Sequence, residues 1–307
     1  MGRYVARRLL LTIPVLIGAS LLIFAMVYAL PGDPVRALGG DRPLPEAVQA
    51  QIRAEFNLDD PLLIQYGKYV LGLVQGDFGT DFAGRPVLDT ISSRLPVTAT
   101  LTAVAIVFEI IIGIAAGVLA GLRRGSFFDN LVLVTTTLVV SIPVLVLGFV
   151  SQYALAVRLG LFPVAGITQG LYSYLLPGFI LAATSLAYVA RLTRTSLADS
   201  LRADYVRTAR AKGLDRRTVV VRHTLRNSLI PVVTFIGADI GGLLGGAIIT
   251  ESVFNIPGLG RAVFDAISRQ EGAVVVGIVT LLVFFFIFFN LVVDVLYAVL
   301  DPRIRYE

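Results

Sequence analysis

Six long apolar stretches, separated by polar segments, dominate the hydrophobic pattern of this 307-residue chain. A helix needs about 20 apolar residues to cross the hydrocarbon core of a bilayer, and each stretch has roughly that length or more. The pattern therefore predicts an all-α polytopic membrane protein with six transmembrane helices. The expected spans are 9–30, 97–122, 131–157, 174–192, 229–252 and 273–300.

The first apolar stretch has two interpretations. Arg3, Arg7 and Arg8 precede it, as basic residues do in a cleaved signal peptide. Its apolar run of 22 residues exceeds the ~7–15 residues of a signal-peptide core. We therefore expect residues 1–30 to be an N-terminal segment and the first transmembrane helix.

A polar insert at 31–96 carries nine acidic and six basic residues. Pro45 favours a helix start, and Val48, Ile52 and Phe56 then share one helical face. A second short helix is expected at 61–73, followed by a turn at 76–79. The insert is predicted to be a small helical domain outside the membrane.

The distribution of basic residues predicts the orientation of the spans. With both termini inside, 17 Lys and Arg residues lie on the cytoplasmic side and nine outside, six of these in the long insert. The net charge of +5 and the mean hydropathy of +0.82 fit a membrane protein, so the charge gives no reason to expect a nucleic-acid partner. A permease-like core is expected at 97–300, with a cytoplasmic loop at 193–228 and a cytoplasmic tail at 301–307.

The loop before the fifth span is strongly basic. Seven of the residues between Asp204 and Pro231 are Arg or Lys, and apolar residues recur at helical spacing on both sides of Gly213. A glycine ends a helix readily because it adopts a left-handed conformation at low cost. We expect two short helices joined at Gly213 that lie on the cytoplasmic face.

Two sequence motifs in this loop, DYVRTARAKGL at 204–214 and RHTLRNSLIPVV at 222–233, resemble the corresponding loop of ABC importer permeases that carry dipeptides and oligopeptides. The general pattern of such loops begins Glu-Ala-Ala, whereas this chain has Arg207, Thr208 and Ala209 before Gly213. Both this change and the late proline at 231 fit the peptide branch. The LPGDP word at 30–34 resembles the exit of the family's first span.

The resemblance implies a B-type permease subunit of the bacterial inner membrane and a set of partner proteins. These are a second homologous permease, two ATPase subunits and an extracytoplasmic substrate-binding lipoprotein, with no nucleic acid. The chain has no Walker phosphate-binding sequence, so ATP and magnesium are expected on the ATPase subunits. Members of the family carry dipeptides, longer peptides, glutathione, nickel chelates or haem. The residues expected to couple the chain to the ATPase are Asp204, Tyr205, Arg207, Ala209, Arg210, Lys212 and Gly213.

Carboxylates inside the spans are costly and call for an explanation. Glu109 lies in the second span and Asp239 in the fifth, and each could serve a structural hydrogen bond or the transport pathway. Gly237, Gly241 and Gly245 lie four residues apart, a spacing that lets helices approach closely. This stripe fits either packing within the chain or packing against a partner permease.

The motif ESVFNIPGLG at 251–260 resembles one that is typical of the family at the outer end of the fifth span. The resemblance suggests that Glu251, Phe254, Pro257 and Gly258 contact the binding protein. The chain has one histidine, His223, and no cysteine, so no metal cluster or catalytic triad is expected. An ion-coupled secondary transporter that uses Asp239 and Glu109 is the alternative function, although the two halves show no repeat. An intramembrane enzyme lacks a nucleophile–base pair.

Overall fold

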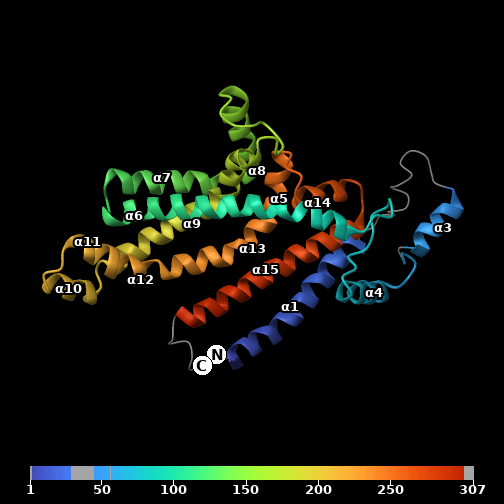
Figure 1. Cartoon of the computed structure of the whole chain (residues 1–307), viewed down its shortest axis with the longest axis horizontal. Helices are drawn as coiled ribbons and strands as arrows, with labels where there is room; N and C mark the ends of the chain where they lie inside the picture. Colours follow the sequence, from blue (N-terminus) through green and yellow to red (C-terminus); the bar gives the residue numbers. More distant parts are fainter. Residues whose placement is uncertain (1, 29–44, 56, 301–307) are drawn as a thin grey trace.

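The computed structural model describes residues 2–28, 45–55 and 57–300, and the part of the chain that it describes is almost entirely helical (Figure 1). Five helical segments are long and apolar enough to cross a membrane. The prediction of an all-α membrane protein is confirmed. These segments are α1 (Gly2–Tyr28), the continuous run of α5 (Val87–Phe108), η1 (Glu109–Gly113) and α6 (Ile114–Leu122), the run of η3 (Gly170–Tyr174) and α9 (Leu175–Ser200), α13 (Ile230–Val253) and α15 (Gly272–Leu300).

The expected span at 131–157 is not one straight helix. It consists of α7 (Phe127–Ser141) followed by α8 (Val144–Ser151) and the π-helix η2 (Gln152–Arg158), and the two parts meet at an angle of 104°. The bend lies at Ile142 and Pro143. A proline lacks the backbone N–H that continues a helix and forces the preceding residue into an extended conformation, which Ile142 adopts. If this bent pair counts as one span, the chain has six.

Two helix boundaries differ from the predictions. α5 begins at Val87 rather than at 97, so the last ten residues of the expected insert are the first turns of a long helix. Val87 and Ile91 are buried against α14 (Leu259–Ser268) and α15, and this burial stabilises helical turns that look polar in sequence. The fourth helix, α9, continues to Ser200 and therefore includes the start of the expected loop at 193–228.

The helix α9 is the centre of the fold and packs against α5, α6, α7 and α13. Three glycines of the second span face it at a spacing of four residues. A Cβ atom at Gly117 would lie 2.5 Å from the carbonyl oxygen of Ala190, and one at Gly113 would lie 2.8 Å from Cγ1 of Val189. Side chains at these glycines would clash, so the second span and α9 pack as closely as two backbones allow.

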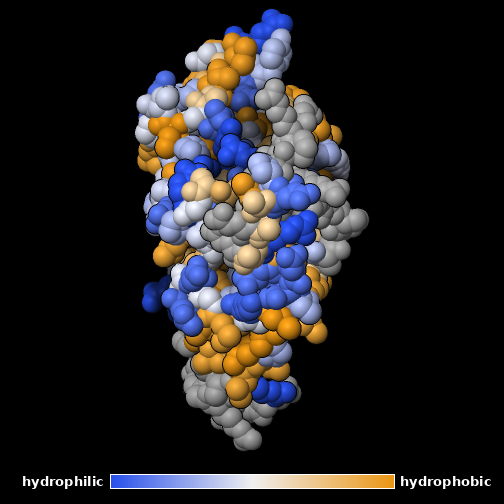
Figure 2. All heavy atoms as spheres, turned by 90° about the vertical axis from the view of Figure 1, so that its right-hand side faces the viewer, coloured by the Kyte–Doolittle hydropathy of each residue, from blue (hydrophilic) through white to orange (hydrophobic). Residues whose placement is uncertain are grey.

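The insert and the basic loops lie at opposite ends of the molecule (Figure 1). The insert contains α3 (Glu46–Glu55) and α4 (Leu62–Val74), close to the helices expected from the sequence. The positive backbone φ of Gly76 and Gly79 confirms the predicted turn. Figure 2 looks at this end and shows hydrophilic residues across its middle and hydrophobic residues below them.

The N-terminal half of α1 and the C-terminal half of α15 lie side by side, where Arg8 and Asp294 form an ion pair of 3.0 Å. The predicted helix break at 30–34, the position of Phe56 and the tail at 301–307 lie outside the described residues. Which face is cytoplasmic stays a prediction from the charge distribution.

Candidate coupling and pathway sites

The loop between α9 and α13 forms the predicted pair of short helices. α10 (Asp204–Ala211) ends at Lys212, and Gly213 follows with a φ of +78°. The N–H of Gly213 donates to the carbonyl of Arg210 at 2.9 Å, and the N–H of Leu214 donates to the carbonyl of Ala209 at 3.3 Å. These two bonds form a Schellman motif, which requires a left-handed residue at the position of Gly213. The predicted role of this glycine as a helix terminator is confirmed.

The second helical piece starts three residues after Gly213 with α11 (Arg216–Thr218) and continues through the π-helix η4 (Val219–Leu225) and α12 (Arg226–Ser228). Asp215 caps it, because its carboxylate accepts a bond of 3.1 Å from the N–H of Thr218. Hydrogen bonds from Thr218 hold the pKa of the Asp215 carboxyl below its usual value. The cap is therefore fully formed at neutral pH.

Tyr205 and Ala209 differ in burial, although the two lie four residues apart on α10. Ala209 packs with Val206 and Val219 in a small apolar cluster that joins the two helical pieces. Tyr205 is 41% exposed, and Leu214 beside the hinge is 39% exposed. In this conformation the Ala209 side chain holds the loop together, and its expected contact with the ATPase stays a prediction.

Basic side chains surround the exposed Tyr205. Arg207, Arg210 and Lys212 are exposed, and Arg207 lies 3.4 Å from the carboxylate of Asp204. Both members of this pair are largely solvated, so their attraction contributes little. The guanidinium groups remain accessible to the carboxylates of a partner protein.

A buried ion pair fixes the helix that leads into this loop. Arg194 of α9 binds Asp129 of α7 through two nitrogen atoms: Nε lies closest to Oδ1, and Nη2 lies 2.9 Å from Oδ2. The Asp129 side chain is 2% exposed and that of Arg194 is 14% exposed. The N–H of Gly125 also donates to Asp129, at 2.8 Å. The pair joins the turn between α6 and α7 to the last turns of α9, and the sequence analysis missed both residues.

Asp129 gave a weak signal in the sequence. It follows Ser126, the N-cap of α7, by three positions, a spacing typical of a helix N-terminus, and its partner is 65 residues away. Nothing in the local pattern identified Arg194 as the partner, because an ion pair between distant segments depends on how the helices pack.

The two carboxylates predicted inside the spans lie near enough to each other to interact electrostatically. Glu109 is fully buried at the start of η1, and neither of its carboxylate oxygens has a hydrogen-bond partner. Asp239 is half-buried on α13, close enough for its charge to act on Glu109, and its Oδ2 also lacks a partner. Ser185 of α9 lies within hydrogen-bonding reach of Asp239. A role of this pair in the transport pathway stays a prediction.

The glycine stripe of α13 divides into two parts. A Cβ atom at Gly237 would lie 2.5 Å from Cγ2 of Val293, and one at Gly241 would lie 2.7 Å from the Cα atom of Phe286. Both glycines therefore permit close packing against α15 of the same chain. Gly245 has no atom within 4 Å of that position and is exposed. Packing against a partner permease stays a hypothesis for Gly245 alone.

The segment after α13 is held inside the fold by contacts with α5 and α14, and we call this arrangement the bracket. Glu251 is fully buried, accepts a bond of 2.6 Å from the hydroxyl of Thr98 on α5, and accepts one of 3.0 Å from the N–H of Arg261. Phe254 is 1% exposed. A Cβ atom at Gly258 would overlap the Glu251 carboxylate.

This bracket corrects the expected contact with a binding protein. Glu251, Phe254 and Gly258 are buried in the fold, and of the four candidates only Pro257 is exposed, next to the exposed Asn255. The motif at 251–260 therefore packs α5, the C-terminal end of α13 and the start of α14 onto one another. A partner at this end of the molecule can reach Asn255 and Pro257 but not Glu251, Phe254 or Gly258.

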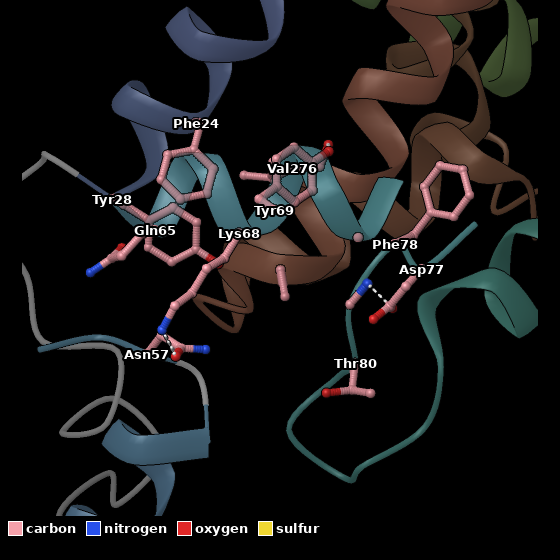
Figure 3. A pocket seen from close by; sticks show the side chains of 13 residues that line it. Phe24, Tyr28, Asn57, Gln65, Lys68, Tyr69, Asp77, Phe78, Thr80 and Val276 are labelled. Atoms are coloured by element: carbon pink, nitrogen blue, oxygen red, sulfur yellow. Dashed lines mark hydrogen bonds between the residues drawn. The ribbon is translucent and has the colours of Figure 1, made fainter. Parts of the chain in front are cut away.

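A pocket of about 240 Å³ lies at the end of the molecule that carries the insert, where α1, α4, the turn at 76–79 and the start of α15 meet (Figure 3). Its polar groups bind one another. Lys68 bonds to Asn57, Asp77 accepts the N–H of Gly79 at 2.8 Å, and the hydroxyl of Tyr69 donates to the carbonyl of Val276 at 3.3 Å. Burial raises the pKa of Tyr69 to about 12, so this hydroxyl stays neutral. The pocket is therefore a contact region between the insert and the spans, in which these polar groups already have hydrogen-bond partners.

The described residues contain no group of three or more His, Cys, Asp or Glu side chains that could hold a metal ion. His223 lies in η4, and its carbonyl accepts a bond of 3.2 Å from the side chain of Asn227. The chemistry that the structure offers is therefore docking at the loop and charge inside the membrane.

The fold resembles a chain of the methionine ABC transporter MetNI, solved in inward-facing conformations. Two crystal forms match with a TM-score of 0.58 each, at 18% and 19% sequence identity. The matches cover 69% and 70% of this chain and 96% and 97% of the other chain. At this identity the likeness concerns the fold alone.

Curated relatives match the chain from end to end. The glutathione transport system permease protein GsiC of Escherichia coli is 42% identical over 308 residues and covers all of both chains. The dipeptide transport system permease protein DppB of Alkalihalophilus pseudofirmus is 37% identical over 331 residues and covers 99% of each. These similarities confirm the resemblance to peptide-branch ABC importer permeases and favour it over an ion-coupled secondary transporter.

Two family profiles cover most of the sequence. The profile described as "Binding-protein-dependent transport system inner membrane component" matches residues 113–306. The profile described as "Binding-prot-dependent transport system membrane comp, N-term" matches residues 1–102. Together with the apolar helices, they identify a multi-pass protein of the bacterial inner membrane. The chain therefore belongs to the family of inner-membrane components of binding-protein-dependent transport systems.

Proposed function

We propose that this chain is a permease subunit of an ABC importer that moves dipeptides and oligopeptides into the bacterial cytoplasm. The observation that carries the proposal is the end-to-end similarity to a dipeptide permease and a glutathione permease. Glutathione is itself a small peptide, so both relatives are named for the same class of substrate.

The assembled importer contains this chain, a second permease of the same kind, two ATPase subunits and an extracytoplasmic substrate-binding lipoprotein. The ATPase subunits bind ATP and magnesium, because this chain has no Walker phosphate-binding sequence. The chain itself acts as a conduit and contributes no catalytic residue. Both termini and the loop between α9 and α13 face the cytoplasm, in agreement with the concentration of basic residues there.

Coupling starts at the exposed face of α10. Tyr205 provides an aromatic anchor for a groove on the ATPase, and Arg207 and Arg210 pair with acidic side chains at its rim. The Schellman hinge at Gly213 and the apolar cluster of Val206 and Val219 keep the loop rigid. Displacement of α10 therefore moves the whole loop rather than bending it.

The displacement then passes into the membrane through α9. The ion pair of Arg194 with Asp129 makes the turn between α6 and α7 follow the last turns of α9. Close packing at Gly117 transmits the same motion along the second span. Helices that line the pathway thus rotate together when ATP closes the ATPase pair, which is the requirement for alternating access.

The direct test is reconstitution. The chain is purified with the permease and ATPase subunits encoded beside it, placed in proteoliposomes and supplied with the binding protein and labelled dialanine. We expect dialanine uptake that depends on ATP and on the binding protein. Co-purification without dipeptide uptake would reject the substrate class, and failure to bind any ATPase would reject the ABC assignment of the complex.

A further inference from the structure

A polar layer interrupts the apolar interior of the spans. It contains Glu109 on the second span, Asp239 on α13 and Ser185 on α9. Along each of these helices the layer lies between two apolar clusters. One cluster includes Leu101, Ala105, Leu181 and Leu243, and the other includes Val189, Val232 and Ile236.

Three carboxylate oxygens in this layer have no donor among the described residues: both oxygens of Glu109 and Oδ2 of Asp239. A buried carboxylate without a partner costs several kcal/mol or more, so such oxygens call for a positively charged group. Glu109 also starts a π-helical stretch in the middle of a span, and π-bulges inside helices are frequent at functional sites. Two independent features thus make this layer a candidate binding site.

The layer opens onto a surface without side chains. Asp239 is half-buried, and its Oδ1 lies 3.4 Å from where a Cβ atom at the exposed Gly242 would be. One turn further on, the exposed Gly245 has no atom within 4 Å of the equivalent position. A ligand can therefore approach the α13 backbone closely beside Asp239, while Glu109 is fully buried in the layer.

We propose that Glu109 and Asp239 form a binding site for the primary ammonium group of the transported peptide. A primary ammonium has three N–H donors, and the layer contains three carboxylate oxygens that lack a donor among the described residues. The α-amino group of a peptide has a pKa of about 8 and is mostly protonated at neutral pH. Every unblocked linear peptide carries this group, so the site recognises substrates of any sequence. This inference rests on the proposed peptide function.

The test uses the assembled membrane complex in nanodiscs without its binding protein, so that selection by that protein does not contribute. The probes are dialanine and N-acetyl-dialanine, which lacks the ammonium group. We expect the wild-type complex to bind dialanine more tightly by on the order of tenfold or more, the effect of one hydrogen-bonded charge. Glu109→Gln and Asp239→Asn should each lower dialanine affinity towards that of the acetylated probe.

Thr102→Val is the matched control, since Thr102 is buried on the same helix, lacks a partner for its hydroxyl and carries no charge. It should leave the preference for dialanine unchanged. Equal binding of the two probes by the wild-type complex would overturn the proposal without needing any variant. Full dialanine affinity in both carboxylate variants would show that the pair only holds protons.

A further arm replaces sodium with choline, a quaternary cation without N–H donors, at equal ionic strength. Unchanged dialanine affinity supports an ammonium site, whereas competition by sodium would indicate a site for inorganic cations and contradict the proposal. Failure of the peptide function is distinguishable, because the intact importer would then show no dialanine uptake at all. Uptake of dialanine together with equal binding of both probes rejects only the ammonium site.

Discussion

Removal of the charge at Asp129 tests how the coupling loop is anchored. Asp129→Asn leaves the Arg194 guanidinium without an anion at a place where its side chain is only 14% exposed. Breaking a buried ion pair costs about 3–5 kcal/mol, and the residual exposure of Arg194 favours the lower end, about 3 kcal/mol. At ~2–4 °C per kcal/mol, the melting temperature should fall by about 6–12 °C.

Thermal unfolding of the purified complex in nanodiscs measures this loss. Asp204→Asn is the matched control, because it removes an aspartate that pairs with an arginine but is 95% exposed. A surface pair contributes about 0–1 kcal/mol, so the control should shift the melting temperature by at most about 4 °C. The double variant Asp129→Leu with Arg194→Met should recover most of the stability, since apolar replacement removes both charges. Equal shifts for Asp129→Asn and Asp204→Asn would refute the reasoning.

Three further predictions concern other parts of the chain. Gly241→Leu should destabilise the chain by ~1–3 kcal/mol, because a side chain there meets the α15 backbone. Gly245→Leu should leave the fold of the isolated chain intact. Thermal unfolding of the chain alone compares the two variants. Burial opposes ionisation of the Asp81 carboxyl, but the hydrogen bonds of its turn outweigh burial and hold its pKa below the usual value. The ionised carboxylate therefore stabilises this turn above about pH 4, and the stabilisation is lost as the pH falls through the lowered pKa. Hydrogen exchange of the insert at pH 6 and pH 3 measures this loss. Cysteines that replace the exposed Asp59 and Arg216 should react with an impermeant thiol reagent from opposite sides of the membrane, and labelling of both from one side would contradict the topology.

The sequence predicted the elements whose signal is local. A long apolar run determines a span by length alone, so α13 and α15 begin and end within one residue of the predicted limits. The hinge at Gly213 was also predictable, because a glycine after an amphipathic turn typically ends a helix. The bend at Pro143 was missed although its signal was local, since the apolar run continues on both sides of the proline.

The remaining errors come from tertiary packing. The Glu251 carboxylate looks like a surface group after an apolar helix, and only the approach of Thr98 from α5 buries it. Ala209 and Tyr205 are equivalent by helical spacing, and only the position of Val219 determines which of them is covered. The meeting of Glu109 with Asp239 depends in the same way on how the second span and α13 pack, and no spacing in the sequence encodes it.

The most direct test of the account is the number of peptides imported per ATP hydrolysed by a complex that carries Gly213→Pro. Proline removes the N–H that bonds to Arg210 and cannot adopt the φ of +78°, so the two helical pieces lose their fixed angle. Gly84→Pro is the matched control, because Gly84 has a φ of +74°, donates one backbone bond and lies in the insert at the opposite end. We predict that Gly213→Pro keeps basal ATP hydrolysis while dialanine uptake and its stimulation of hydrolysis fall together, and that Gly84→Pro leaves the ratio unchanged. A folded, assembled Gly213→Pro complex that imports dialanine at the wild-type ratio would contradict the claim that this loop couples ATP hydrolysis to transport.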